Sequence, residues 1–92
     1  RHLLWMIKVF LPYKIREILD VPVEIEAEGT NLRGLIDYLE NMYPGVKNQL
    51  VEDDKLRPGM SAVIDGRTTR LGLIQKLENV SEIHFLPAIA GG

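Results

Sequence analysis

The sequence contains no cysteine, and this absence removes several kinds of chemistry at once. Disulfide bonds, thiolate metal sites and cysteine nucleophiles all need a thiol group. This chain can therefore form none of these bonds or sites.

Neither sign of charge dominates, and no long apolar run is present. Eleven lysines and arginines stand against thirteen aspartates and glutamates, for a net charge of -2, so a broad phosphate-binding surface is not expected. The longest apolar run near the start, residues 3–7, is too short to span a membrane, and no small-residue cleavage site follows it. We expect a cytoplasmic protein with neither nucleic acid nor membrane as a partner.

Side chains typical of catalysis are scarce. The two histidines, His2 and His84, have no serine, aspartate or cysteine partner whose position the sequence fixes, so a histidine on the sheet surface is the favoured interpretation of His84. The acidic run at residues 52–54 lacks the ligand spacing and turn glycine of a calcium loop, and a solvated loop is favoured. The glycines form no phosphate-binding fingerprint. We expect no metal or cofactor bound by this chain and no catalytic side chains, which leaves open whether it is an enzyme.

The residues that are present suffice for one domain, with 92 residues of which 46% are hydrophobic. Residues 3–11 alternate apolar and other side chains, which predicts a strand ended by Pro12. Residues 21–27 alternate most clearly, with Val21, Val23, Ile25 and Ala27 on a buried face and glutamates on the other. Between them, residues 13–17 read as an irregular connection. Residues 1–5 are interpreted as an extension of the domain.

The middle of the sequence changes to a helical period. Apolar residues recur at steps of three and four, and Thr30 or Asn31 is placed to cap the first turn: Leu32, Leu35, Ile36, Leu39, Met42 and Tyr43. Pro44-Gly45 ends this helix. Residues 46–56 have no clear period and fit a short helical turn around Leu50 and Val51.

The last third predicts strands joined by tight turns. A turn at residues 56–59 leads into a strand at residues 60–64, and Asp65-Gly66 is a strong signal for a two-residue hairpin. We expect a short strand at residues 67–70, a single helical turn within residues 71–77 and a final strand at residues 82–87. This order predicts an α+β fold in which one main helix packs across one face of a mixed sheet of four to five strands.

The sequence ends in Gly91-Gly92, and its neighbours are small or apolar. Glycine has no Cβ, so the two make a thin, extended thread whose carboxylate could enter a narrow channel in a partner. Apolar side chains before it would dock on that partner, and Pro87 would close the last strand. The predicted partner-binding residues are Phe85, Leu86, Pro87, Ala88, Ile89, Ala90 and Gly91. A frayed chain end explains the same residues equally well.

This ending, with the helix and the Asp65-Gly66 hairpin at matching intervals before it, resembles the MoaD/ThiS sulfur-carrier family. The resemblance covers residues 6–92 and is closest in the tail to the small subunit of molybdopterin synthase. It implies a ubiquitin-like β-grasp domain at residues 6–86 and a flexible carrier tail at residues 87–92. One departure is Val80, which stands in the turn before the last strand where the family usually has glycine.

The resemblance also implies a mechanism centred on Gly92. An adenylating activating enzyme would use ATP to activate the Gly92 carboxylate, and a sulfur donor protein would then displace AMP to leave a thiocarboxylate. The tail would deliver this sulfur inside the large subunit of molybdopterin synthase, for molybdenum cofactor biosynthesis. The chain itself would be a non-catalytic, sulfur-donating subunit, and ATP would be used only by the partner enzyme.

Three other functions stay open at this point. The chain could be a ubiquitin-like modifier joined to other proteins through Gly92, a thiamine-type sulfur carrier, or an interaction module whose tail is never activated. Outward apolar and basic positions are candidates for a contact patch, and ordinary packing explains them as well: Met6, Phe10, Leu56 and Arg57.

Overall fold

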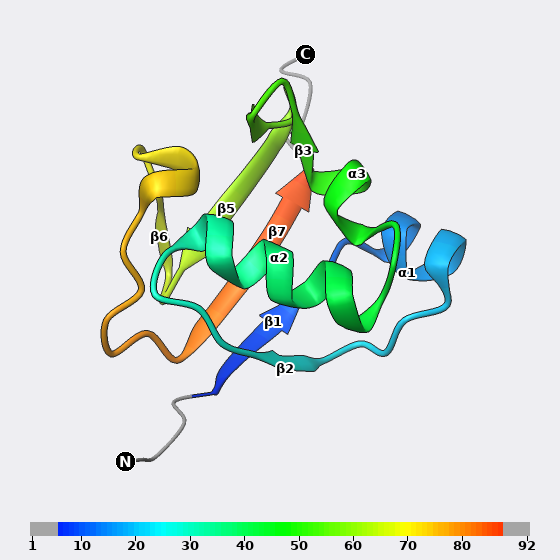
Figure 1. The fold of residues 1–92 in the computed structure, drawn as a ribbon, viewed down its shortest axis with the longest axis horizontal. Coiled ribbons are helices and arrows are strands. Elements are labelled where there is room, and N and C mark those ends of the chain that lie inside the picture. Colours follow the sequence, from blue (N-terminus) through cyan, green and yellow to red (C-terminus); the bar gives the residue numbers. More distant parts are fainter. Residues whose placement is uncertain (1–5, 88–92) are drawn as a thin grey trace.

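The computed structural model describes residues 6–87, so the predicted strand residues before Met6 and the tail residues 88–92 lie outside the described part. Its elements are β1 (Ile7–Phe10), α1 (Tyr13–Leu19), β2 (Ile25–Ala27), α2 (Leu32–Met42), α3 (Val46–Leu50), β3 (Val51–Glu52), β4 (Lys55–Leu56), β5 (Met60–Ile64), β6 (Arg67–Thr68), the short 3-10 helix η1 (Gly72–Ile74) and β7 (Glu82–Pro87) (Figure 1). None of the helices within residues 6–87 is long and apolar enough to cross a membrane.

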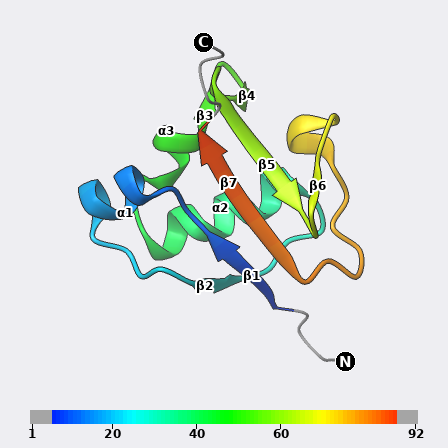
Figure 2. The same cartoon turned by 180° about the vertical axis from the view of Figure 1, so that it is seen from behind.

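Five strands form one mixed sheet in the order β2-β1-β7-β5-β6, and β3 and β4 form a separate hairpin. The central strand β7 pairs in parallel with β1 and antiparallel with β5. The helix α2 crosses one face of this sheet, and the view from behind shows the strands β1, β7 and β5 in front of the helices (Figures 1 and 2). The predicted α+β architecture is confirmed.

The core lies between α2 and the sheet, where the helical period and the strand alternation meet. The apolar face of α2 is buried through Leu32, Leu35, Ile36 and Leu39. Its sheet partners alternate with exposed residues along β1 and β7: Ile7, Val9, Ile83 and Phe85. Burial of each such side chain contributes about 1.5 to 3 kcal/mol. Because the apolar stripe of α2 packs on the apolar face of the strands, the opposite face of the sheet stays uncovered.

The N-terminus of α2 is capped as predicted, and Asn31 is the capping residue of the two candidates. Its Oδ1 atom accepts a hydrogen bond of 2.8 Å from the backbone N–H of Gly34. The helix ends before Pro44, also as predicted, and the Glu40 carboxylate accepts hydrogen bonds from the backbone N–H groups of Gly45 and Lys47. These contacts hold the start of α3 against the end of α2.

Two predictions for the first third of the chain are wrong. Residues 13–17 belong to the helix α1, which the sequence hid because only Ile15 of this short helix is buried. The second strand is limited to Ile25–Ala27, and Val23 is 60% exposed although the alternation placed it on the buried face. The chain bends at residues 23–24, so the alternation of apolar residues does not continue as a strand there.

The turns of the second half follow their residue types. Asp65 and Gly66 both have positive φ angles, 48° and 86°, which is the backbone of the predicted two-residue hairpin turn. The predicted helical turn around Leu50 is α3, but Val51 starts β3 instead of continuing the helix. In the turn before β7 the positive φ falls on Asn79, and Val80 is buried in the core. Glycine is therefore not required at residue 80 in this chain.

Candidate functional site

The carboxyl end of β7 is the point from which the predicted carrier tail starts. Pro87 pairs with Met60 of β5, so the strand includes the residue at which the tail was predicted to begin. The predicted tail residues Ala88, Ile89, Ala90, Gly91 and Gly92 follow directly and lie outside the described residues. The site is therefore built from the surface around Pro87.

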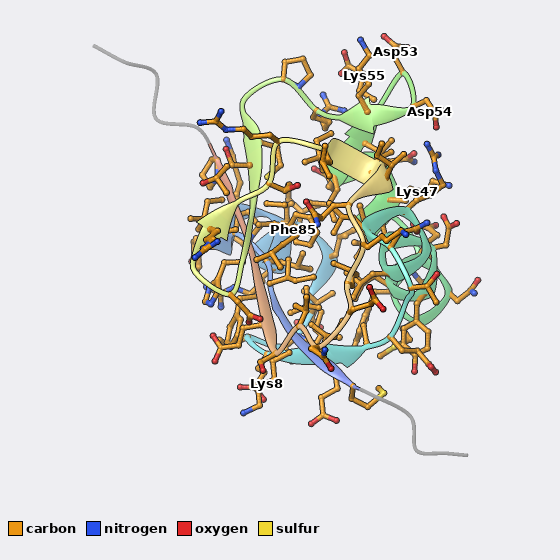
Figure 3. The ribbon with its side chains drawn as sticks, turned by 90° about the vertical axis from the view of Figure 1, so that its left-hand side faces the viewer. Lys8, Lys47, Asp53, Asp54, Lys55 and Phe85 are labelled. Atoms are coloured by element: carbon orange, nitrogen blue, oxygen red, sulfur yellow. The ribbon has the colours of Figure 1, made fainter. Side chains whose placement is uncertain are left out.

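The last residues of β7 alternate between the core and the surface. Leu86 is 46% exposed, whereas Phe85 is fully buried and lies in the interior of the molecule (Figure 3). Phe85 was predicted to dock on a partner, but its side chain is part of the core and is not available for this contact. The reason is the period of the strand, which turns Phe85 toward the same face as Ile83.

A groove of about 780 Å³ lies beside this end of β7. It is formed by β7, the end of β1, the helix α1 and the turn between β4 and β5. Three exposed large apolar side chains line it, namely Tyr13, Ile18 and Leu86. Such grouping of exposed apolar side chains in a concave surface is typical of a binding site.

The charged side chains that line the groove are all basic: Lys14, Arg16 and Arg57. The Nε atom of Arg16 donates a hydrogen bond of 3.1 Å to the backbone carbonyl of Leu11, and its guanidinium lies 5.5 Å from the centre of the Tyr13 ring. Arg57 donates to the carbonyl of Asn48 and forms an ion pair of 3.2 Å with Glu52. The two arginines are thus held in place at the rim of an apolar groove.

His84 and Phe10 stack in the groove, on the face of the sheet opposite α2. Their ring centroids are 4.4 Å apart, and Nε2 of His84 lies 3.1 Å from Oε1 of Glu82. The structure thus places His84 on the sheet surface, as the sequence predicted, and an aromatic ring covers one of its faces. The stacked rings offer a contact surface in the groove, and no serine, threonine or aspartate lines the groove beside His84.

The structure separates the four residues proposed as a contact patch. Phe10 and Arg57 line the groove, Leu56 lines a different hollow, and Met6 is half-buried and lies outside the groove. Sequence reasoning missed Tyr13 and Ile18 because it did not predict α1. No local signal could have shown that these residues line the same groove as Leu86, since their common location depends on the parallel pairing of β1 with β7.

The acidic run at residues 52–54 lies in and after β3, and two of its carboxylates pair with arginines. Glu52 pairs with Arg57, and Asp54 accepts a short hydrogen bond from Arg33. This bond, more than the charge of Arg33 alone, holds the pKa of the Asp54 carboxyl below its usual range. Among residues 6–87, no group of three or more histidines, aspartates or glutamates is arranged to hold a metal ion.

Comparison with known proteins agrees with this fold. No curated protein sequence matches the chain significantly. Among solved structures, the chain is similar to one in the BexX/CysO complex of Amycolatopsis orientalis, at 27% identity and a TM-score of 0.83, covering 94% of this chain and 99% of that one. It is also similar to the small archaeal modifier protein 1 of Methanosarcina acetivorans, at 25% identity and a TM-score of 0.76, covering 99% and 100% of the two chains.

A third structure, Urm1 from Trypanosoma brucei, has a TM-score of 0.69 at 22% identity over 95% of both chains, and it supports the fold alone. These neighbours confirm the predicted β-grasp architecture. The model of the ThiS family matches residues 9–92, which includes the strands around the groove and the glycine pair that ends the sequence. The chain therefore belongs to the ThiS family.

Proposed function

We propose that this chain is a sulfur carrier whose Gly92 carboxylate is activated and converted to a thiocarboxylate by partner proteins. The observation that carries the proposal is the ThiS family match, which extends through the final glycine pair at residue 92. The geometry supports it, because the tail starts at Pro87, next to an apolar groove where a partner could hold the domain.

In this proposal the chemistry takes place on the tail, and the domain provides the contact surface. A carboxylate oxygen of Gly92 attacks the α-phosphate of ATP in the activating enzyme, and pyrophosphate leaves. Sulfur at the oxidation level of sulfide, supplied by a donor protein, then attacks the carbonyl carbon and displaces AMP. The catalytic groups and the ATP site belong to the partners.

The side chains around Pro87 suit the recognition of such a partner. Leu86 and the Phe10–His84 stack present apolar area on the open sheet face, and the rim arginines can pair with carboxylates of the partner. Pro87 has a fixed φ angle and an antiparallel partner in Met60, so the residue that precedes the tail is held against β5.

We propose that the sulfur acceptor is a pterin precursor bound by the large subunit of molybdopterin synthase, on the basis of the Pro-x-x-x-Gly-Gly ending. A second candidate function is protein modification, in which Gly92 forms an amide with lysines of target proteins. The similarity to a small archaeal modifier protein favours this alternative specifically. Both functions need the same activation step and differ in the group that accepts the activated carbonyl or its sulfur.

The test is intact-mass spectrometry of the purified chain after incubation with its activating enzyme, ATP and a sulfide source. We expect a gain equal to the replacement of one oxygen by sulfur, located on Gly92 by fragmentation. Gly91→Val should fold normally but lose this gain, because a side chain there blocks a narrow channel. Gly91→Ala is the matched control and should retain part of it.

Two outcomes would count against the proposal: an unmodified wild-type chain under these conditions, or Gly91→Val thiolated at the wild-type rate. Conjugates between Gly92 and lysine side chains, found in protein from the native host, would instead establish the modifier function. Transfer of sulfur to a pterin precursor in the presence of the large subunit would establish the acceptor.

A further inference from the structure

A second apolar and basic surface lies at the opposite side of the sheet from α1, around η1 and β6. Leu71 and Ile74 are 57% and 68% exposed there, although both are large aliphatic side chains. Four basic residues surround them. We call this surface the η1 patch and define it by six residues: Lys55, Arg67, Arg70, Leu71, Ile74 and Lys76. Figure 3 views the molecule from this side, with η1 next to the hairpin that carries Lys55.

The η1 patch is concave on both sides of the Thr69–Leu71 segment. One hollow of about 480 Å³ is lined by Lys55, Leu56, Arg70, Leu71 and Ile74 among others. A second hollow of about 440 Å³ is lined by Arg67, Arg70, Leu71 and Lys76 among others. Neither hollow shares a lining residue with the groove at the end of β7. The patch and the groove are therefore separate surfaces.

The basic side chains of the patch are not neutralised within the described part of the chain. Lys55, Arg67, Arg70 and Lys76 take part in none of the ion pairs found among residues 6–87. Two of the three carboxylates that line the hollows have other partners. Asp54 pairs with Arg33, and Asp65 accepts hydrogen bonds from the backbone N–H groups of Ser81 and Glu82. Glu78 is the remaining carboxylate that lines either hollow.

The apolar and basic side chains of the η1 patch indicate which kind of partner would bind there. Exposed aliphatic side chains favour an apolar partner group, and unpaired arginines and lysines around them favour carboxylates. We propose that the η1 patch binds an acidic segment of a partner protein, in which an apolar side chain lies between aspartates or glutamates. The apolar side chain packs on Leu71 and Ile74, and the carboxylates pair with Arg67 and Arg70.

A polypeptide fits this surface better than a nucleic acid does. No aromatic side chain lines either hollow, so there is no platform on which a base could stack. The cations also flank an apolar centre, whereas binding of a phosphate backbone needs a continuous basic track. The acidic strand β2 of a second copy of this chain is another acidic segment, and the experiment below separates it from a foreign partner.

The test uses the full chain as the target for selection from a random peptide display library. We expect enriched peptides that combine Asp or Glu with an aliphatic residue, and amide shifts at Leu71 and Ile74 when a selected peptide is added to labelled protein. Arg67→Glu combined with Arg70→Glu should weaken binding about tenfold or more, as removal of close charge pairs does. Lys14→Glu, on the groove, is the matched charge-reversal control and should change the affinity less than about twofold.

Leu71→Ser tests the apolar half of the proposal without disturbing the core, because the side chain is already exposed. It should weaken peptide binding and leave the thermal unfolding midpoint nearly unchanged. Four results would overturn the proposal: no enriched acidic peptide, peptides that bind the double variant as tightly as the wild type, tighter binding of a single-stranded RNA, or self-association in sedimentation that Arg67→Glu abolishes.

Discussion

Phe10 and His84 lie directly opposite each other in the parallel pairing of β1 with β7, and their rings are stacked with planes only 7° apart. The contact joins strands from near the two ends of the sequence. Both rings also line the groove beside Pro87. The register of the sheet thus produces the contact surface that the proposed partner would use.

Phe10→Ala should weaken binding to the activating enzyme about tenfold, because aromatic anchors dominate many interfaces. Loss of the stack should also reduce the free energy of unfolding by about 0.5 to 1.5 kcal/mol. Lys8→Ala is the matched control, since Lys8 lies on the same strand and face but outside the groove. Titration calorimetry measures the binding, and equal affinities of the two variants would contradict the assignment of the groove.

The neighbours Phe85 and Leu86 should respond in opposite ways to truncation. Phe85→Ala should lower the free energy of unfolding by about 3 to 5 kcal/mol, because it leaves a cavity in the core. Leu86→Ala should change it by less than about 1 kcal/mol, since the side chain is half exposed, but should weaken partner binding. Urea unfolding and binding assays on both variants separate the effects. A folded Phe85→Ala protein with selective loss of binding would contradict this division.

Asn31→Ala should cost about 1 kcal/mol of stability, because the backbone N–H of Gly34 loses its capping acceptor. Asn31→Ser should restore most of this loss, since serine is a comparable cap. Thr30→Ala serves as the control, because Asn31 and not Thr30 caps α2. Chemical denaturation of the three variants is the measurement, and a larger loss for Thr30→Ala would show that the cap is misassigned.

The ion pair of Arg33 with Asp54 predicts a pH dependence with a definite sign. The hydrogen bond from Arg33 lowers the pKa of Asp54 in the folded state, so the ionised carboxylate favours folding. This contribution is present above the unfolded pKa, about 3.9, and is lost as the pH falls through the lower folded value. Because both side chains are largely exposed, the effect on stability should be small and should shrink with added salt.

Titration of Asp54 by NMR measures this effect directly. In the Arg33→Gln variant the midpoint should rise toward the ordinary carboxyl value. The stability difference between the wild type and Asp54→Asn should also disappear in the Arg33→Gln background. An unchanged midpoint would show that Arg33 is not the cause of the shift.

The elements predicted well from the sequence are those with a strong period or a specific turn. The α2 helix combines a continuous apolar stripe with the Asn31 cap and a proline stop, and the Asp65-Gly66 turn needs two positive φ angles that few other residue pairs adopt. The α1 helix was missed because one buried residue, Ile15, makes no detectable period. The alternation at residues 21–27 predicted too long a strand, because the chain bends at residues 23–24, before β2 begins.

The candidate site was predictable only in part. Leu86, which lines the groove, was predicted from the sequence, whereas the role of the glycine pair stays a prediction. The strand period alone would have assigned Phe85 to the core. The groove could not be predicted, because its walls come from α1, the turn at Arg57 and Pro58, and β7, and only the tertiary fold brings these together. The η1 patch likewise combines residues from separate segments of the chain, from Lys55 in β4 to Lys76.

The position of β7 between β1 and β5 has a consequence for how the protein is made. The centre of the sheet is filled by the last strand of the described residues, so a chain that is cut or stalled before Glu82 lacks the strand that joins β1 to β5. Such a fragment could not close its core. A folded domain therefore requires that synthesis has reached β7, which precedes the proposed carrier tail, and incomplete chains would be exposed to proteolysis before any partner could bind them.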